Sequence, residues 1–190
     1  MSAGILVILG RQGSGKGTQS LRIAERFGVL HLSTGDVLRA AVAASTEIGQ
    51  IAAEVMASGG LVGDEIMNAL VAGRLAESDV MESGVVLDGF PRTADQADAL
   101  AKIVADLGQE LVVAVNLDVP VAEVTTRLMA RGREDDTEEA IARRLDLYEE
   151  ETAPLRGWFD ERGLLVTVDG LGSEDEVFAR IEEAIENAMA

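Results

Sequence analysis

The sequence predicts a three-layer α/β fold, in which helices cover both faces of one five-stranded parallel sheet. Strand-like runs alternate with helical patterns, and the runs are apolar at nearly every position, as in sheets buried on both faces. The length of 190 residues fits one domain, residues 1–190, with about eight helices and room for small insertions. The predicted strands are Ile5–Leu9, Val29–Leu32, Val85–Leu87, Leu111–Leu117 and Leu164–Val168.

The connection after the first strand is rich in glycine and leads into a helical pattern. It reads GRQGSGKGT over Gly10–Thr18. Glycines let successive backbone N–H groups turn toward one anion, and the start of a helix adds partial positive charge. Lys16 would supply a full charge for the outer phosphates, and Thr18 a hydroxyl suited to Mg²⁺. The pattern indicates a phosphate-binding P-loop, with Gly17 inserted between the usual lysine and hydroxyl residue.

The second predicted strand is followed by the segment Ser33–Arg39. Ligands of doubly wound sheets bind at the carboxyl ends of the strands, so Thr34 and Arg39 are expected beside the P-loop. The alternative is a capped helix start with one exposed arginine. Residues 33–62 hold two helical patterns without a strand between them, which predicts a small helical insertion near the site.

The third predicted strand runs into Asp88, Gly89, Pro91 and Arg92. An aspartate that ends a strand beside a P-loop is suited to Mg²⁺ or to its water shell. Glycine and proline predict a stiff turn, which would hold Arg92 over the strand ends as a phosphate clamp. The alternative is an ordinary turn with a surface arginine.

Patterns typical of helix caps occur at Thr93–Gln96, Asp136–Glu139 and Ser173–Glu176. Gln96 could therefore serve only to complete a cap. Residues 130–137 form a short polar loop, which we interpret as a lid over the site. An arginine cluster surrounds it, and the alternative for these residues is a solvated charge run. The cluster comprises Arg127, Arg131, Arg133, Arg143 and Arg144.

Acidic residues outnumber basic residues 34 to 16, which gives a net charge of −18. This balance disfavours general nucleic-acid binding, and it fits either a solubilising surface or adaptation to high salt. The chain has no cysteine, which excludes disulfides and thiolate metal sites. It also has no run of eighteen apolar residues and no positively charged N-terminal segment, so we expect a cytoplasmic protein without a membrane span or signal peptide. Nothing in the pattern suggests an obligate oligomer, so a monomer is expected.

Five motifs together resemble the adenylate kinase family of nucleoside monophosphate kinases, in its short-lid form. They occur in the family's order along nearly the whole chain. They are GxxGxGKGT at Gly10–Thr18, STGDxLR at Ser33–Arg39, LDGFPRT with Gln at Leu87–Gln96, RGRxDD at Arg131–Asp136, and RRL through TAPL at Arg143–Leu155.

The resemblance implies reversible transfer of a phosphoryl group from MgATP to AMP, giving two ADP. It assigns the charge-neutralising catalytic roles to Lys16, Arg92, Arg133 and Arg144. The ATP-binding residues would be Gly13, Ser14, Gly15, Lys16, Gly17, Thr18, Arg127, Arg131 and Gly172. The AMP-binding residues would be Thr34, Arg39, Gly60, Leu61, Val62, Gly89, Phe90, Pro91, Arg92, Gln96, Arg133 and Arg144. Mg²⁺ would lie near Thr18 and Asp88, held through water, and no zinc is expected because the lid lacks cysteine ligands.

The chain departs from the family pattern in two places. Gln12 stands where proline is usual, and Gly60 stands where lysine is common. Uridylate and cytidylate kinases share most of the motifs, but alanine is usual at the position of Thr34 and asparagine at that of Gln96, so both residues favour AMP. Two alternatives stay open: a P-loop kinase with another acceptor, and a nucleotide-binding regulator with little chemistry.

Overall fold

The computed structural model describes residues 4–131 and 137–189, the side chain of Arg131 excepted. The predicted five-stranded parallel sheet is confirmed, with strand ends that differ from the prediction by one residue. Its strands are β1 (Ile5–Gly10), β2 (Leu30–Ser33), β3 (Val85–Asp88), β4 (Leu111–Asp118) and β5 (Leu165–Asp169). They lie in the order β2-β3-β1-β4-β5, and every neighbouring pair is parallel. β1 is therefore central, at the point where the strand order changes direction.

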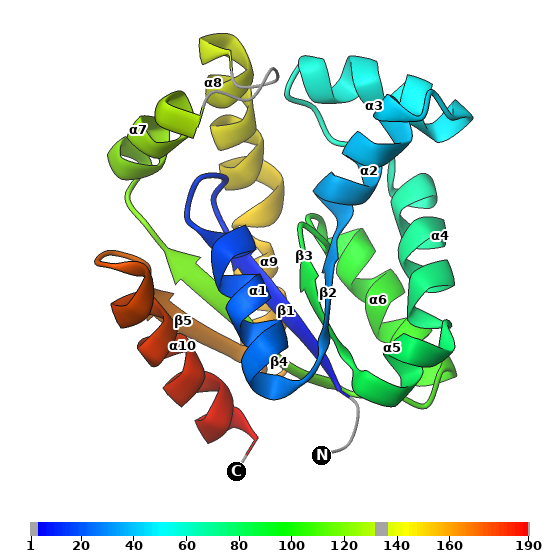
Figure 1. Ribbon diagram of the computed structural model, residues 1–190, viewed down its shortest axis with the longest axis vertical. Helices are drawn as coiled ribbons and strands as arrows, with labels where there is room; N and C mark the ends of the chain where they lie inside the picture. Colours follow the sequence, from blue (N-terminus) through cyan, green and yellow to red (C-terminus); the bar gives the residue numbers. More distant parts are fainter. Residues whose placement is uncertain (1–3, 132–136, 190) are drawn as a thin grey trace.

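Helices cover both faces of the sheet (Figure 1). They are α1 (Lys16–Phe27), α2 (Thr34–Ala43), α3 (Glu47–Ala57), α4 (Asp64–Leu75), α5 (Ser78–Ser83), α6 (Ala94–Asp106), α7 (Val121–Arg131), α8 (Glu138–Leu147), α9 (Leu155–Asp160) and α10 (Glu174–Ala188). A π-helical turn, η1 (Tyr148–Thr152), continues α8. The described residues thus hold ten α-helices, more than the eight expected, because six-residue helices such as α5 and α9 are too short for a periodic pattern.

Two hydrophobic clusters explain why the strands are apolar throughout. Alternate residues of β1 point to opposite faces of the sheet: Ile5, Val7 and Leu9 pack with α4, α6 and α9, whereas Leu6 and Ile8 pack with α1 and α10. All five of these side chains are buried. Because both faces of the central strand are covered, its carboxyl end is fixed, and the loop that follows inherits that position.

Helix caps agree in part with the sequence prediction. Ser173 and Glu176 form the expected capping box at the start of α10. At α6, Thr93 accepts a hydrogen bond from the Gln96 backbone. At α8, the capping residue is Thr137, which accepts from the Ala140 backbone, one residue later than predicted. Within the described residues, every helix is too short or too polar to cross a lipid bilayer.

Candidate active site

A cavity of about 490 Å³ opens at the carboxyl edge of the sheet, above β1, β2 and β3. It brings together predicted residues from four separate motifs and two from outside them, Leu61 and Arg127. The motif residues are Gly13, Gly15, Lys16, Gly17, Thr18, Arg39, Asp88, Gly89, Pro91, Arg92 and Arg144. A smaller cavity of about 50 Å³ is lined by Gly60, Leu61, Val62 and Gln96, and it shares Arg39, Gly89, Arg92 and Arg144 with the first. The predicted gathering of distant motifs at one sheet edge is therefore observed.

The P-loop runs from β1 into α1, and its glycines adopt backbone angles that other residues rarely take. Gly13 has a φ of 83° and Gly15 a φ of 97°. A Cβ atom on Gly13 would lie 2.8 Å from the Leu128 side chain and 2.9 Å from the Val124 carbonyl oxygen, both on α7. The Lys16 ammonium donates hydrogen bonds to the carbonyls of Gly10, at 2.7 Å, and Arg11, at 2.9 Å. The loop thus curls tightly around its lysine.

Three arginines from separate elements gather near the P-loop. Arg39 comes from α2, Arg92 from the loop after β3, and Arg144 from α8. Burial lowers the pKa of Arg92 below its ordinary value; Asp88 opposes this shift, and the charges of Arg144 and Arg39 add to it. The Arg92 Nε atom donates to the Gly89 carbonyl at 2.8 Å, which holds the side chain in place. Positive charge confined in this way favours an anion between the three guanidinium groups.

The other two arginines in this group are each held by a neighbouring protein group. Arg39 pairs with Asp36 on the same helix turn. Arg144 donates to the Met56 carbonyl of α3 at 3.1 Å. Because α8 and the end of α3 touch there, Arg144 lies over the segment that connects α3 with α4. That segment carries Gly60, Leu61 and Val62.

The amide of Gln96 is buried, and its orientation is determined by its neighbours. Its oxygen accepts a hydrogen bond from the Arg92 backbone at 2.7 Å, and its nitrogen donates to Asp64 Oδ1 at 2.7 Å. A second bond joins Asp64 Oδ2 to the Thr93 hydroxyl at 3.0 Å. A carboxylate accepts but does not donate, so Asp64 must face the NH₂ group. Sequence reasoning missed Asp64, which lies 32 positions from its partner.

Oxygen groups suited to a hard cation line the same large cavity. The Thr18 hydroxyl comes from α1, and the Asp88 carboxylate comes from the end of β3. A Cβ atom on Gly17 would lie 3.6 Å from Asp88 Oδ2, so the two elements are close. These donors fit Mg²⁺ held partly through water. His31 lies 3.8 Å from Asp88 and also lines the cavity, a position that sequence reasoning did not predict. Among the described residues, no group of three or more His, Cys, Asp or Glu side chains is arranged to hold a metal ion.

Some predicted site residues lie elsewhere or outside the described residues. Ser14, Thr34 and Phe90 are buried and line neither cavity. Gly172 also lines neither cavity, and it is exposed in the loop after β5. Arg127 lies beside the P-loop, with its Nε bonded to Glu123 at 2.7 Å. Arg133 and the Arg131 side chain lie outside the described part of the chain, as does most of the predicted lid 130–137.

Comparison with known proteins agrees with this arrangement. Residues 8–164 match the family model described as Adenylate kinase. The chain is 47% identical over 184 residues to an adenylate kinase of Xanthomonas campestris pv. campestris, an alignment that covers 95% of this chain and 98% of the relative. It is 48% identical over 185 residues to an adenylate kinase of Phocaeicola vulgatus, with 95% and 97% covered. With its P-loop, gathered arginines and near full-length similarity, the chain belongs to the adenylate kinase family.

Proposed function

We infer that the chain transfers a phosphoryl group reversibly from MgATP to AMP, giving two ADP, in the cavity above β1 and β3. One observation carries this inference: a single cavity holds the P-loop lysine together with Arg39, Arg92 and Arg144, which come from three other elements. A protein that only bound ATP would need the P-loop, but it would have no use for Arg39, Arg92 and Arg144 around a second anion. Two facing phosphate chains account for both sets of charges.

On the ATP side, the roles follow the P-loop. Backbone N–H groups of Gly13–Thr18 would hold the phosphates, and Lys16 would exchange its two carbonyl partners for phosphate oxygens. Because the backbone of Ser14 would make this contact, burial of its side chain is compatible with phosphate binding. Thr18 and Asp88 would hold Mg²⁺, which when bound neutralises charge on the phosphate oxygens. Arg127, Arg131 and Gly172 stay predicted contacts of ATP.

On the AMP side, Arg39, Arg92 and Arg144 would hold the phosphate, with Arg133 a predicted fourth member. The small cavity beside Gln96 would take the base, between Leu38 and Met67. Gly60, Leu61, Val62 and Gly89 border that space. Thr34, Phe90 and Pro91 stay predicted AMP contacts, and they would act by shaping the walls.

The chemistry needs charge neutralisation more than proton transfer. The attacking group is a phosphate oxygen of AMP, which is already anionic, so no general base is required. The barrier lies in bringing two polyanions into line, and fixed cations lower it by positioning and by neutralising the charge that moves. Residues 33–62 and 130–137 are proposed as covers that exclude water during transfer. A cytoplasmic location and a monomeric state stay predictions.

A coupled assay for ADP formed from ATP and AMP tests the proposed function directly. We expect ADP formation with AMP and Mg²⁺, and at least tenfold lower kcat/KM with CMP or UMP, because a site built to hydrogen-bond one base rejects others. A preference for CMP or UMP would favour the pyrimidine nucleotide kinase alternative. Tight ATP binding without ADP formation would favour a regulator.

The Asp64–Gln96 bond predicts an effect on base selection. In Asp64→Ala, the Gln96 NH₂ group loses its acceptor, so we expect KM for AMP to rise about fivefold to tenfold, the loss of roughly one hydrogen bond to a charged group. KM for ATP is expected to stay within twofold. Asp64→Asn is the matched control, because its side-chain oxygen can still accept from Gln96. Equal KM values for AMP in Asp64→Ala and Asp64→Asn would contradict the prediction.

A further inference from the structure

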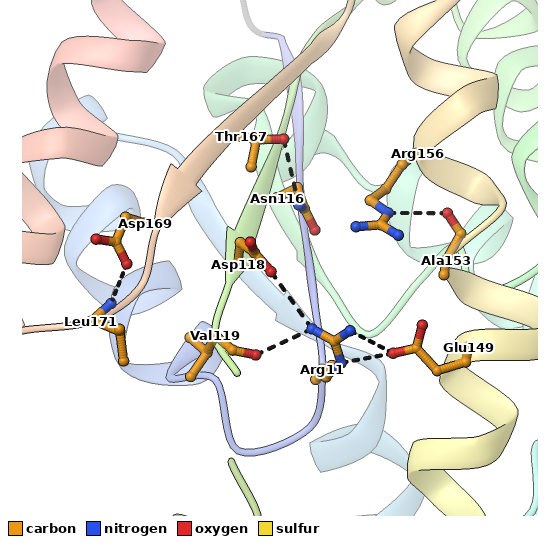
Figure 2. Close-up of polar contacts among 10 residues, drawn as sticks. All are labelled: Arg11, Asn116, Asp118, Val119, Glu149, Ala153, Arg156, Thr167, Asp169 and Leu171. Atoms are coloured by element: carbon orange, nitrogen blue, oxygen red, sulfur yellow. Dashed lines mark hydrogen bonds and ion pairs between the residues drawn. The ribbon is translucent and has the colours of Figure 1, made fainter. Parts of the chain in front are cut away.

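Arg11 lies at the start of the P-loop, and its side chain joins three distant parts of the chain (Figure 2). Its Nε donates to Glu149 at 2.8 Å, and its NH2 atom lies 2.6 Å from the same carboxylate oxygen. Its NH1 atom donates to the Val119 carbonyl at 3.1 Å and lies 3.6 Å from Asp118. The Arg11 side chain is only 15% exposed, whereas that of Glu149 is 47% exposed.

The partners of Arg11 lie on elements that carry the two ends of the site. Asp118 ends β4 and Val119 follows it, and the chain then enters α7, which packs against Gly13. Glu149 lies on η1, the π-helical turn that continues α8, and α8 carries Arg144. The Arg11 guanidinium also lies 5.3 Å from the centre of the Tyr148 ring, on the same turn. One side chain therefore connects the P-loop with the base of the Arg144 helix.

The backbone of Arg11 belongs to the ring of groups that surrounds Lys16. Its carbonyl oxygen accepts from the Lys16 ammonium at 2.9 Å and from the Ser14 backbone at 3.1 Å. The loop around it contains Gly10, Gly13 and Gly15, all with positive φ, and no proline. Glycines restrain the backbone little, so the loop's own sequence does not fix its shape. The partly buried guanidinium, with its several partners, supplies a restraint from outside the loop.

We propose that Arg11 is a positioning residue that ties the P-loop to η1 through Glu149. It keeps Lys16 and Arg144 at a set separation across the cavity. It does not touch the substrates through its side chain and acts through the loop and the helix that it joins. The part of this inference that concerns turnover rests on the proposed function.

The test compares Arg11→Ala, Glu149→Ala and the double variant with the unaltered chain. Two quantities are measured: the Kd for ATP by calorimetry, and turnover with ATP and AMP at a temperature well below every Tm. We expect each single variant to raise the Kd for ATP and to lower kcat, by about tenfold, because misplaced groups lose alignment steeply. The double variant is expected to lose no more than the worse single variant, since both remove one contact.

The matched control is Arg74→Ala, which breaks a similar ion pair with Asp79 at the end of α4, away from the cavity. We expect this control to lower Tm without changing kcat or the Kd for ATP. Glu149→Gln is included in case a larger change impairs folding. The glutamine side chain keeps one hydrogen-bond acceptor but loses the charge. We expect its Kd for ATP and its kcat to lie between those of Glu149→Ala and the unaltered chain.

The results separate the two proposals. Additive losses in the double variant, or a lowered Tm with unchanged Kd and kcat, would overturn the positioning role. If the unaltered chain binds ATP but forms no ADP from AMP, the proposed function fails, and the Kd comparison still decides the role of Arg11. A Kd for ATP about tenfold higher in Arg11→Ala and Glu149→Ala than in the unaltered chain would then support the role of Arg11, and an equal Kd would refute it.

Discussion

Replacement of Arg92 by alanine is expected to lower turnover at least about 10³-fold, the scale found for arginines that stabilise phosphoryl transfer. Arg92 is fixed by its bond to the Gly89 carbonyl, and it lies near Arg39 and Arg144, with which we propose that it binds AMP. The same change is expected to leave Tm unchanged or higher. The pKa of Arg92 is lowered mainly by burial and further by the charges of Arg144 and Arg39, so the folded protein disfavours the charged form. Removal of the charge therefore relieves a desolvation cost and some repulsion.

Turnover and thermal unfolding of Arg92→Ala are measured together, with Arg162→Ala as the control. Arg162 precedes β5 at the opposite edge of the sheet and lies 3.7 Å from the Trp158 ring centre, so its loss is expected to spare turnover. Arg92→Lys keeps the charge but lacks the planar guanidinium, so its turnover is expected to lie between those of Arg92→Ala and Arg162→Ala. A loss of tenfold or less in Arg92→Ala would refute the clamp role.

Replacement of Lys16 by methionine is expected to lower kcat by about 10²- to 10³-fold, the cost of removing one aimed donor from a developing charge. Methionine keeps an unbranched side chain and loses the ammonium that bonds the Gly10 and Arg11 carbonyls. Since those carbonyls lie on the P-loop, KM for ATP is expected to rise more than KM for AMP. Initial rates over a grid of both nucleotides give the two constants.

Lys102 is the only other lysine, and it lies exposed on α6. Lys102→Met is therefore a control for the chemical change itself, and we expect it to behave like the unaltered chain. Equal rises of both KM values in Lys16→Met, or kcat within threefold of the unaltered chain, would contradict the assignment of Lys16 to the ATP phosphates.

The sequence predicted the parts of the site that depend on local order along the chain. The P-loop, Asp88 and Arg92 each follow a strand, and parallel strands present their carboxyl ends at one edge, so a strand prediction also placed these residues. The Asp64–Gln96 and Arg11–Glu149 contacts were not predicted, because they join residues 32 and 138 positions apart. Such pairs depend on how helices pack and how side chains turn, and no spacing rule encodes either.

This contrast between local order and long-range packing also explains the smaller disagreements between the prediction and the structure. Two neighbouring residues, Asp136 and Thr137, can both cap a helix by residue type, and Thr137 is the one that accepts from the Ala140 backbone at the start of α8. Thr34 begins α2 at the predicted place, but its hydroxyl turns inward toward the Asp88 carbonyl, at 3.4 Å. Backbone position was thus predictable where side-chain direction was not.

The crowding of Arg39, Arg92 and Arg144 has a consequence for how the protein endures in a cell. Like charges held together store repulsion until phosphate groups arrive, and whatever binds only the folded form makes unfolding harder in proportion to its concentration. The adenine nucleotides are then more than reactants. A falling nucleotide supply would leave the enzyme both idle and easier to unfold.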